Sequence, residues 1–163
     1  MHKDLSEQLL RELLKNSKRS DRELAKILGV SQPTITRTRS RLEREGIIQD
    51  YTIIPDLRKM GFELLGINFA KIRPEILSSD MREKAEEFIG GFPGTIFASS
   101  GEGMGFNAVS IAVYRNYTEF QKRVNQFRAE WKDVVENIQS FVVAIGEREY
   151  KRLSLTYLKD VPP

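Results

Sequence analysis

The sequence predicts an α+β protein with a small helical part at its N-terminal end and a larger, sheet-containing part after it. Two helical patterns joined by a glycine turn lie within residues 20–46, and the apolar period changes to a β-type pattern directly after Gly46. The remaining residues follow the order strand, helix, strand, strand, helix, strand. We therefore expect two domains in the 163-residue chain, at residues 1–60 and 61–163.

Three helices are expected in the first domain. Residues 4–16 place leucines on one helical face behind a capping Asp4. The next helix begins after Ser20, because Ser20 and Glu23 have the spacing of a capping box. It ends at Gly29, since glycine readily takes the left-handed conformation that stops a helix. The leucine face of the first helix is expected to pack across the two helices that follow.

The third helix is expected to run from Ser31 to Gly46, with Ser31 as its N-cap and Pro33 in its first turn. Its outward side has no acidic residue before Glu43. Side chains of Arg, Thr, Ser and Gln on such a helix can hydrogen-bond base edges and phosphates in the major groove of DNA. The outward residues are Gln32, Thr34, Thr36, Arg37, Ser40, Arg41 and Arg44. An ordinary two-helix corner with a solvated basic face is the alternative interpretation.

Positive charge is concentrated in the first domain. Residues 1–60 contain 13 Lys and Arg against 9 Asp and Glu, a net charge of +4, whereas residues 61–163 contain 13 against 14, a net charge of −1. An excess of this kind suits attraction to phosphates without requiring it. Lys18 and Arg19, between the first two helices, are further candidates for phosphate contacts.

Residues 47–54 contain isoleucines and a tyrosine around a polar pair, a pattern that predicts a short β-hairpin. A β-wing directly after a DNA-reading helix makes a winged helix-turn-helix. Pro55 ends the strand pattern, and residues 57–61 are expected to form a brief helical turn.

The second domain is expected to have a ferredoxin-like βαββαβ fold, with helices on one face of an antiparallel sheet. The expected strands are residues 63–72, 95–100, 107–114, 135–145 and, as a fifth, 148–158. The expected helices are residues 80–89, capped by Asp80 with Glu83, and a helix beginning at Thr118 with Gln121. A domain of this size leaves the other sheet face uncovered, so we expect a homodimer formed through these sheets. Such pairing sets two DNA-reading helices at half-sites roughly one helical turn (~34 Å) apart.

Composition excludes several kinds of site. The chain has no cysteine, which rules out disulfides and thiolate metal sites, and its only histidine is His2. Most zinc sites and any serine–histidine–aspartate arrangement are therefore excluded. The longest apolar run, residues 141–145, is far short of a membrane span, and residues 1–10 lack a signal-peptide core. We expect a cytoplasmic protein that does not bind membranes, needs no cofactor and is not an enzyme.

Three stretches resemble the leucine-responsive/asparagine-synthetase regulator (Lrp/AsnC, feast/famine) family of bacterial and archaeal transcription regulators. They are LAKILGVSQPTITRTRSRLEREGII, YTIIPDLRKMGF and FPGTIFASSG. The resemblance implies a winged helix that binds double-stranded DNA and a C-terminal domain that dimerises and often assembles further into octamers. It also implies an amino-acid effector near the loop between the second and third strands. The candidate effector residues are Ser100, Gly101, Glu102, Gly103 and Asn107.

Two positions depart from the family pattern. Arg39 stands on the inward stripe of the third helix, where the family usually has an aliphatic residue, so either its stem covers the core or the helix is rotated slightly. The stretch SSGEGMGFNAVSIAV is longer than the family's turn into the third strand and has no Asp. In that stretch Glu102 or Asn107 could bind an ammonium or amide group, while glycine N–H groups could hold a carboxylate. A hairpin that needs glycine only for its turn is the alternative.

The leading hypothesis is a sequence-specific regulator of transcription. Arg37 and Gln32 are expected to read bases with help from Thr36 and Ser40. The phosphate contacts are expected from Lys18, Arg19, Arg41 and Arg44, and Ser31 and Thr34 complete the predicted DNA-binding set. An enzyme that resembles the decarboxylases of sirohaem biosynthesis is one alternative, which the lack of histidine in the second domain disfavours. An effector-sensing module with secondary DNA binding is the other.

Overall fold

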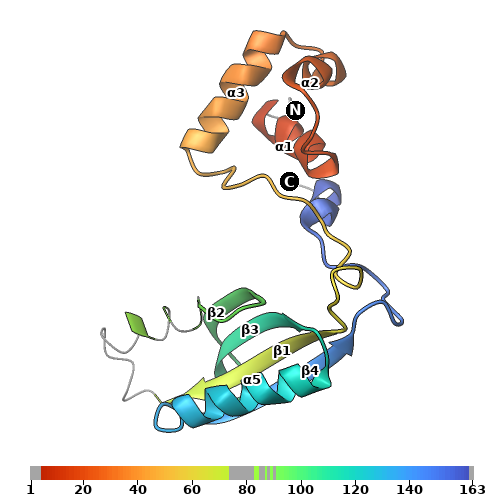
Figure 1. The fold of residues 1–163 in the computed structure, drawn as a ribbon. Helices are drawn as coiled ribbons and strands as arrows, with labels where there is room; N and C mark the ends of the chain where they lie inside the picture. Colours follow the sequence, from red (N-terminus) through yellow and green to blue (C-terminus); the bar gives the residue numbers. More distant parts are fainter. Residues whose placement is uncertain (1–4, 74–82, 85–86, 88, 90, 162–163) are drawn as a thin grey trace. The chain divides into compact units, whose positions relative to one another are not determined.

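The computed structural model describes residues 5–73, 83–84, 87, 89 and 91–161 (Figure 1). The chain divides into two compact units. The helical unit comprises the described residues up to 54 together with those from 151 onward, and the sheet unit comprises the described residues of 55–150. The predicted domains of residues 1–60 and 61–163 differ from these units because the end of the chain belongs to the helical unit.

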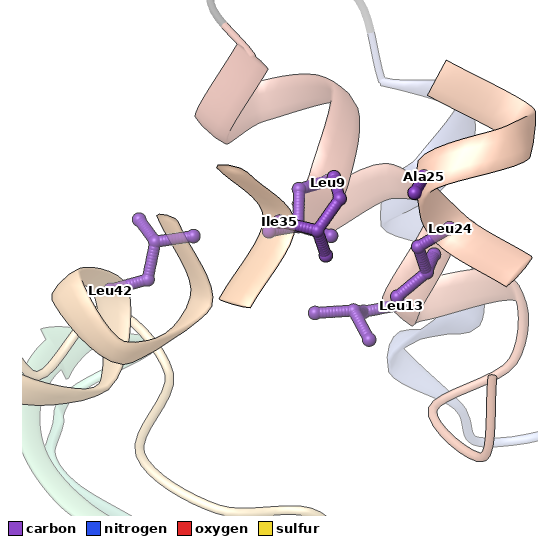
Figure 2. Close-up of a cluster of buried hydrophobic side chains, with 6 residues drawn as sticks. All are labelled: Leu9, Leu13, Leu24, Ala25, Ile35 and Leu42. Carbon is purple, nitrogen blue, oxygen red and sulfur yellow. The ribbon is translucent and has the colours of Figure 1, made fainter. Parts of the chain in front are cut away.

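The helical unit contains α1 (Leu5–Lys15), α2 (Asp21–Leu28) and α3 (Gln32–Arg44). One side of each helix faces a shared apolar core, which Figure 2 shows in close-up. The buried residues of this core are Leu9, Leu13, Leu24, Ala25, Ile35 and Leu42. Burying a leucine or isoleucine side chain contributes about 1.5–3 kcal/mol, so this core holds the three helices at fixed angles.

Local caps define where α2 and α3 begin and end. The Glu23 amide donates to Ser20 Oγ at 3.3 Å and the Ser20 amide donates to Glu23 Oε2 at 2.8 Å, which is the predicted capping box. The Ser20 amide and the Ser20 hydroxyl both donate to the Glu23 carboxylate, and these two bonds lower the pKa of Glu23. Gly29 ends α2 at a φ of 69°, and Ser31 caps α3 by accepting from the Thr34 amide. The turn between the two helices is therefore the one that the sequence predicts.

The predicted β-hairpin over residues 47–54 is wrong. The structure has bends at residues 47–48 and no strand from residue 49 to 54. An isolated two-stranded hairpin is marginally stable, and the exposed Ile53 and Ile54 have no sheet to pack against within this unit. The segment of residues 47–54, which we call the connector, therefore has no regular secondary structure, and residues 57–61 form the expected turn.

The predicted fifth strand over residues 148–158 is also wrong. The chain there forms a 3-10 helix, η2 (Leu155–Asp160), with Ser154 as its cap. This helix packs against α1 instead of joining the sheet. Arg11 fixes it there, because its guanidinium donates to the carbonyls of Lys159 and Val161, the latter at 2.6 Å. The β-type pattern could not reveal a partner that lies about 150 residues away in sequence.

The sheet unit contains β1 (Leu64–Ile72), β2 (Thr95–Gly103), β3 (Phe106–Tyr114), α5 (Tyr117–Glu130) and β4 (Val135–Ala144). Its strands lie in the order β2-β3-β1-β4, and every pair is antiparallel. This order is that of a ferredoxin-like sheet and confirms the predicted fold. Helix α5 lies across one face of the sheet (Figure 1).

Packing of α5 on the sheet buries Ala112, Tyr114 and Phe120. The helix begins at Asn116, whose side chain accepts from the Glu119 amide, and not at the predicted cap Thr118. Asn caps a helix at least as well as Thr does, which accounts for the earlier start. Of the expected helix over residues 80–89, the structure describes only residues 83, 84, 87 and 89, which are helical, and the other residues lie outside the described part of the chain.

The other face of the sheet is apolar. Side chains alternate along β1, so Leu65, Ile67 and Phe69 point away from α5. On the edge strands, Phe141 of β4 is 65% exposed and Phe97 of β2 is 51% exposed. These residues define an open apolar face of the sheet.

None of the helices in the described part of the chain has both the length and the apolar character needed to cross a membrane.

Candidate DNA interface

Helix α3 presents one polar face to solvent because its other face is anchored in the core. Ile35 and Leu42, two turns apart, are fully or almost fully buried. The helix spacing then directs residues 37, 40 and 44 outward, and residue 32 is exposed at the start of the helix. We call Gln32, Arg37, Ser40 and Arg44 the recognition face. All four of these side chains are exposed.

The recognition face carries two cations and two neutral hydrogen-bonding groups. The Arg37 guanidinium lies along the helix, with its Nε donating to the Pro33 carbonyl at 3.3 Å. Its two terminal nitrogens are the donors that bind guanine O6 and N7 in the major groove. The α3 first turn has no acidic residue that would repel a phosphate. The face can therefore present donors to base edges.

The remaining hydroxyls predicted to contact DNA have partners inside the unit. Ser31 Oγ lies 2.7 Å from Thr34 Oγ1 at the start of α3. Thr36 Oγ1 donates to Asp21 Oδ2 at 2.7 Å. A hydroxyl has one proton to donate, so Thr36 can offer a base only its oxygen lone pairs and its methyl group. The sequence predicted the capping role of Ser31, but it could not show that Asp21 holds Thr36.

The side chains that were predicted to contact phosphates differ in whether they already have partners within the protein. Lys18 is exposed, and Arg41 reaches α1, where its Nη2 donates to Ser6 Oγ at 2.6 Å. Arg19 pairs with Glu12. The pKa of Glu12 is lowered by its hydrogen bond to Lys15 first and by Arg19 in addition, so this carboxylate stays charged beside Arg19. Arg19 therefore brings less net positive charge to the surface than Lys18 does.

Arg39 points inward from α3, and the helix keeps its expected face outward. Its Nη2 lies 3.2 Å from Asp21 Oδ1 and donates to the Arg19 carbonyl at 3.2 Å. Tyr51 of the connector covers the guanidinium with its ring, 5.8 Å from ring centroid to Cζ. The sequence marked Arg39 as unusual but gave no sign of these partners, because they come from a different helix and from the connector.

The candidate effector residues lie at one end of the β2–β3 hairpin. Ser100, Gly101, Glu102 and Gly103 are part of β2 and exposed, and the turn is only Met104 and Gly105. Both turn residues have positive φ, 52° and 80°. The second strand therefore continues past residue 100, where the sequence predicted its end, and the connection is a tight two-residue turn, as in the hairpin alternative.

Asn107 of β3 has a structural role. Its side-chain amide donates to the Ile72 carbonyl, and its side-chain carbonyl accepts from the Ile72 amide, each at 2.7 Å. Both polar groups of Asn107 therefore hold the end of β1.

A three-helix unit with a basic outward helix, followed by a ferredoxin-like unit, defines a class of two-domain helix-turn-helix proteins. Residues 3–49 match a family profile described as winged helix-turn-helix DNA-binding. The chain is similar to the HTH-type transcriptional regulator LrpA of Pyrococcus abyssi, with 37% identity over 92 residues. The aligned part covers 56% of this chain and 63% of LrpA, less than two thirds of the relative's length.

Solved structures share the whole two-part fold. An AsnC family transcriptional regulator from Agrobacterium tumefaciens has a TM-score of 0.78 at 17% identity, covering 96% of this chain and 99% of the other. A transcriptional regulator from Neisseria meningitidis, solved as a complex with L-Met, has a TM-score of 0.77 at 19% identity, covering 97% and 99%. The chain is therefore similar to LrpA in sequence over the aligned part and similar in fold to a solved AsnC family regulator.

Proposed function

We propose that this protein is a sequence-specific, DNA-binding regulator of transcription whose α3 lies in the major groove. One observation carries the proposal: Arg37, Ser40 and Arg44 share an exposed face while Ile35 and Leu42 hold the opposite face in the core. A helix fixed in this way can meet base edges in a constant orientation, and its cations attract the phosphate backbone.

Within this proposal the residues have separate roles. Arg37 and Gln32 read bases, with Ser40 and the Thr36 methyl group beside them, while Lys18, Arg41 and Arg44 contact phosphates. Arg19, Ser31 and Thr34 act mainly by holding the unit together, because their side chains already have partners there.

Selection from a random duplex library tests the proposal, because it does not require the operator sequence to be chosen in advance. We expect the purified protein to enrich one motif. Its affinity for that motif should exceed its affinity for unrelated duplex by about 10³-fold or more. The affinity should fall steeply with salt: the logarithm of the affinity should drop by about 0.9 for each tenfold rise in salt concentration and each phosphate contacted. Failure to enrich any motif, with equal affinity for all duplexes, would contradict sequence-specific recognition.

We further propose a homodimer formed through the open apolar face of the sheet. Exposed apolar patches of this kind usually mark an interface, and a two-fold dimer buries the same patch on both copies. An inverted repeat in the selected motif, with half-sites about one helical turn apart, would support the dimer. Further assembly into octamers is tested by light scattering over a range of protein concentrations.

An amino-acid effector is a further part of the proposal. The Neisseria meningitidis regulator with a similar fold was solved with L-Met. Ser100, Gly101, Glu102 and Gly103 are exposed, so they need a second chain to enclose a ligand. Thermal unfolding with a panel of amino acids should show a rise in Tm for the effector only, and Glu102→Ala should abolish that rise.

We also propose that the protein is not an enzyme. The sirohaem-decarboxylase-like alternative predicts a Soret shift when sirohaem is added, whereas a regulator leaves the spectrum unchanged.

A further inference from the structure

We propose that Arg39 is a positioning residue, whose guanidinium sets the orientation of the recognition face by tying α3 to the start of α2 and to the connector. The inference rests on the proposed DNA binding and adds a role for three residues outside the recognition face, namely Arg39, Asp21 and Tyr51.

The first tie joins α3 to the beginning of α2. Arg39 lies on the inward side of α3, and its side chain is only 21% exposed. Its Nη2 contacts Asp21 Oδ1 and the Arg19 carbonyl, each at 3.2 Å. Both partners belong to the chain that enters α2, so Arg39 fixes one helix against the other.

The second tie uses the same carboxylate. Asp21 Oδ2 accepts from Thr36 Oγ1 at 2.7 Å, so Asp21 holds α3 at positions 36 and 39 together. These positions lie one residue before Arg37 and one residue before Ser40. A rotation of α3 about its axis breaks one of the two contacts. Asp21 therefore fixes the angle at which the neighbouring recognition face points outward.

The third tie joins α3 to the connector. The Tyr51 ring covers the Arg39 guanidinium, and the Tyr51 hydroxyl donates to Glu43 Oε1 at 2.8 Å, one turn farther along α3. Burial of Tyr51 and its hydrogen bond to Glu43 raise the pKa of the phenol to about 12, so Tyr51 stays protonated and able to donate. The connector is the segment through which the chain leaves the helical unit after residue 54. Its position is therefore coupled to that of α3.

Stability alone does not account for this arrangement. A half-buried ion pair often contributes no more to stability than apolar residues of similar volume. Among the described residues, the buried atoms Asp21 Oδ1 and Arg39 Nε have no hydrogen-bond partner, so the pair is not ideally aligned. An ion pair adds a directional constraint that an aliphatic side chain lacks, because leucine at position 39 can pack at several helix rotations.

The test uses the full chain and the duplex selected with the wild-type protein. The variants are Arg39→Leu, Asp21→Asn and the double variant, and Lys132→Leu, which removes an exposed cation in the sheet unit, is the control. We expect Arg39→Leu to lose about 10-fold or more in affinity for the selected duplex. This loss is in the range that one mismatched base pair causes. Its affinity for unrelated duplex and its salt dependence should not change.

Asp21→Asn should give the same loss, and the double variant should lose no more than Arg39→Leu alone, since both changes release the same constraint. Asp21→Asn has nearly the wild-type shape, so it carries the test if Arg39→Leu fails to fold. Tyr51→Phe, which keeps the ring and removes the bond to Glu43, should give a smaller loss than Asp21→Asn.

Two results would overturn the proposal. An unchanged ratio of specific to non-specific affinity, with only Tm altered, would make the cluster merely structural. If the slope of log affinity against log salt concentration became shallower by about 0.9, as it does when one phosphate contact is lost, Arg39 itself would contact DNA. Failure of the proposed function is distinct from both, because the wild-type protein would then not discriminate between duplexes at all.

Discussion

At the scale of single residues, Arg37 is the side chain that we propose reads bases. It is exposed near the middle of α3, and its Nε donates to the Pro33 carbonyl of the same helix, which leaves the terminal nitrogens facing outward. Replacing Arg37 with Ala should cost about 1–3 kcal/mol for the selected duplex and relax base preference at one position of each half-site. Fluorescence anisotropy with the selected duplex and its single-base variants measures both effects.

Lys132→Ala is the matched control for Arg37→Ala, since it removes one exposed positive charge outside the helical unit. Its affinity for the selected duplex should stay close to that of the wild-type protein. If Arg37→Ala keeps full affinity and full base preference, Arg37 does not read bases.

Tyr51 gives a prediction on pH. The phenol pKa is about 12 in the folded protein, above the ordinary value of 10 expected in the unfolded chain. Between these two pKa values the folded state keeps a proton that the unfolded state loses. The contribution of the Tyr51 hydroxyl to the free energy of unfolding is therefore intact below about pH 10 and is lost as the pH rises towards about 12. Urea unfolding of the wild-type protein and Tyr51→Phe over this range should show their difference in unfolding free energy shrinking. A difference that stays constant with pH would contradict the raised pKa.

At the scale of elements, local signals predicted the helices and most strands, while long-range contacts decided the rest. The capping box at Ser20, the left-handed Gly29 and the cap at Ser31 depend on neighbours in sequence, so the sequence was enough to place α2 and α3. The connector and η2 have strand-like composition, but the described residues of the helical unit include no strand that could pair with them. Strand formation needs such a partner, and composition alone cannot supply one.

The sequence likewise predicted only part of the candidate DNA interface. Helical periodicity identified the outward side of α3 before any contact was known. It could not show that Thr36 is held by Asp21 or that Asn107 is held by Ile72, because those partners lie 15 and 35 residues away. Of the predicted DNA-binding hydroxyls, Ser40 lies on the recognition face, whereas those of Ser31, Thr34 and Thr36 are engaged within the unit.

The contact between α1 and η2 gives a prediction on stability. Arg11 donates to two carbonyls near the end of the chain and pairs with Glu7. Hydrogen bonds from a charged donor contribute about 1.5–3 kcal/mol, so Arg11→Ala should lower the unfolding free energy of the helical unit by about that much. Urea denaturation followed by hydrogen exchange of α1 measures the loss. Arg22→Ala, at an exposed position of α2, is the control and should change stability by less than about 0.5 kcal/mol.

At the scale of the whole molecule, the open apolar face of the sheet predicts self-association. Phe141 is 65% exposed at the centre of β4, beside β1 residues that also face away from α5. Phe141→Asp places a charge in the proposed interface and should shift the protein towards monomers, as measured by light scattering. Met104→Asp, at the exposed tip of the β2–β3 hairpin, should leave the dimer intact. A Phe141→Asp protein that remains fully dimeric would place the interface elsewhere.

The placement of α3 in the major groove can be measured directly, because the chain has no cysteine to compete with an engineered one. Ser40→Cys on the recognition face and Gln126→Cys on α5 each offer a single site for an iron chelate that cleaves nearby DNA. We predict that the chelate at position 40 cuts the selected duplex in two clusters about one helical turn apart, while the chelate at position 126 cuts weakly or diffusely. Equal cleavage from both positions, or none from position 40, would contradict recognition of DNA by α3.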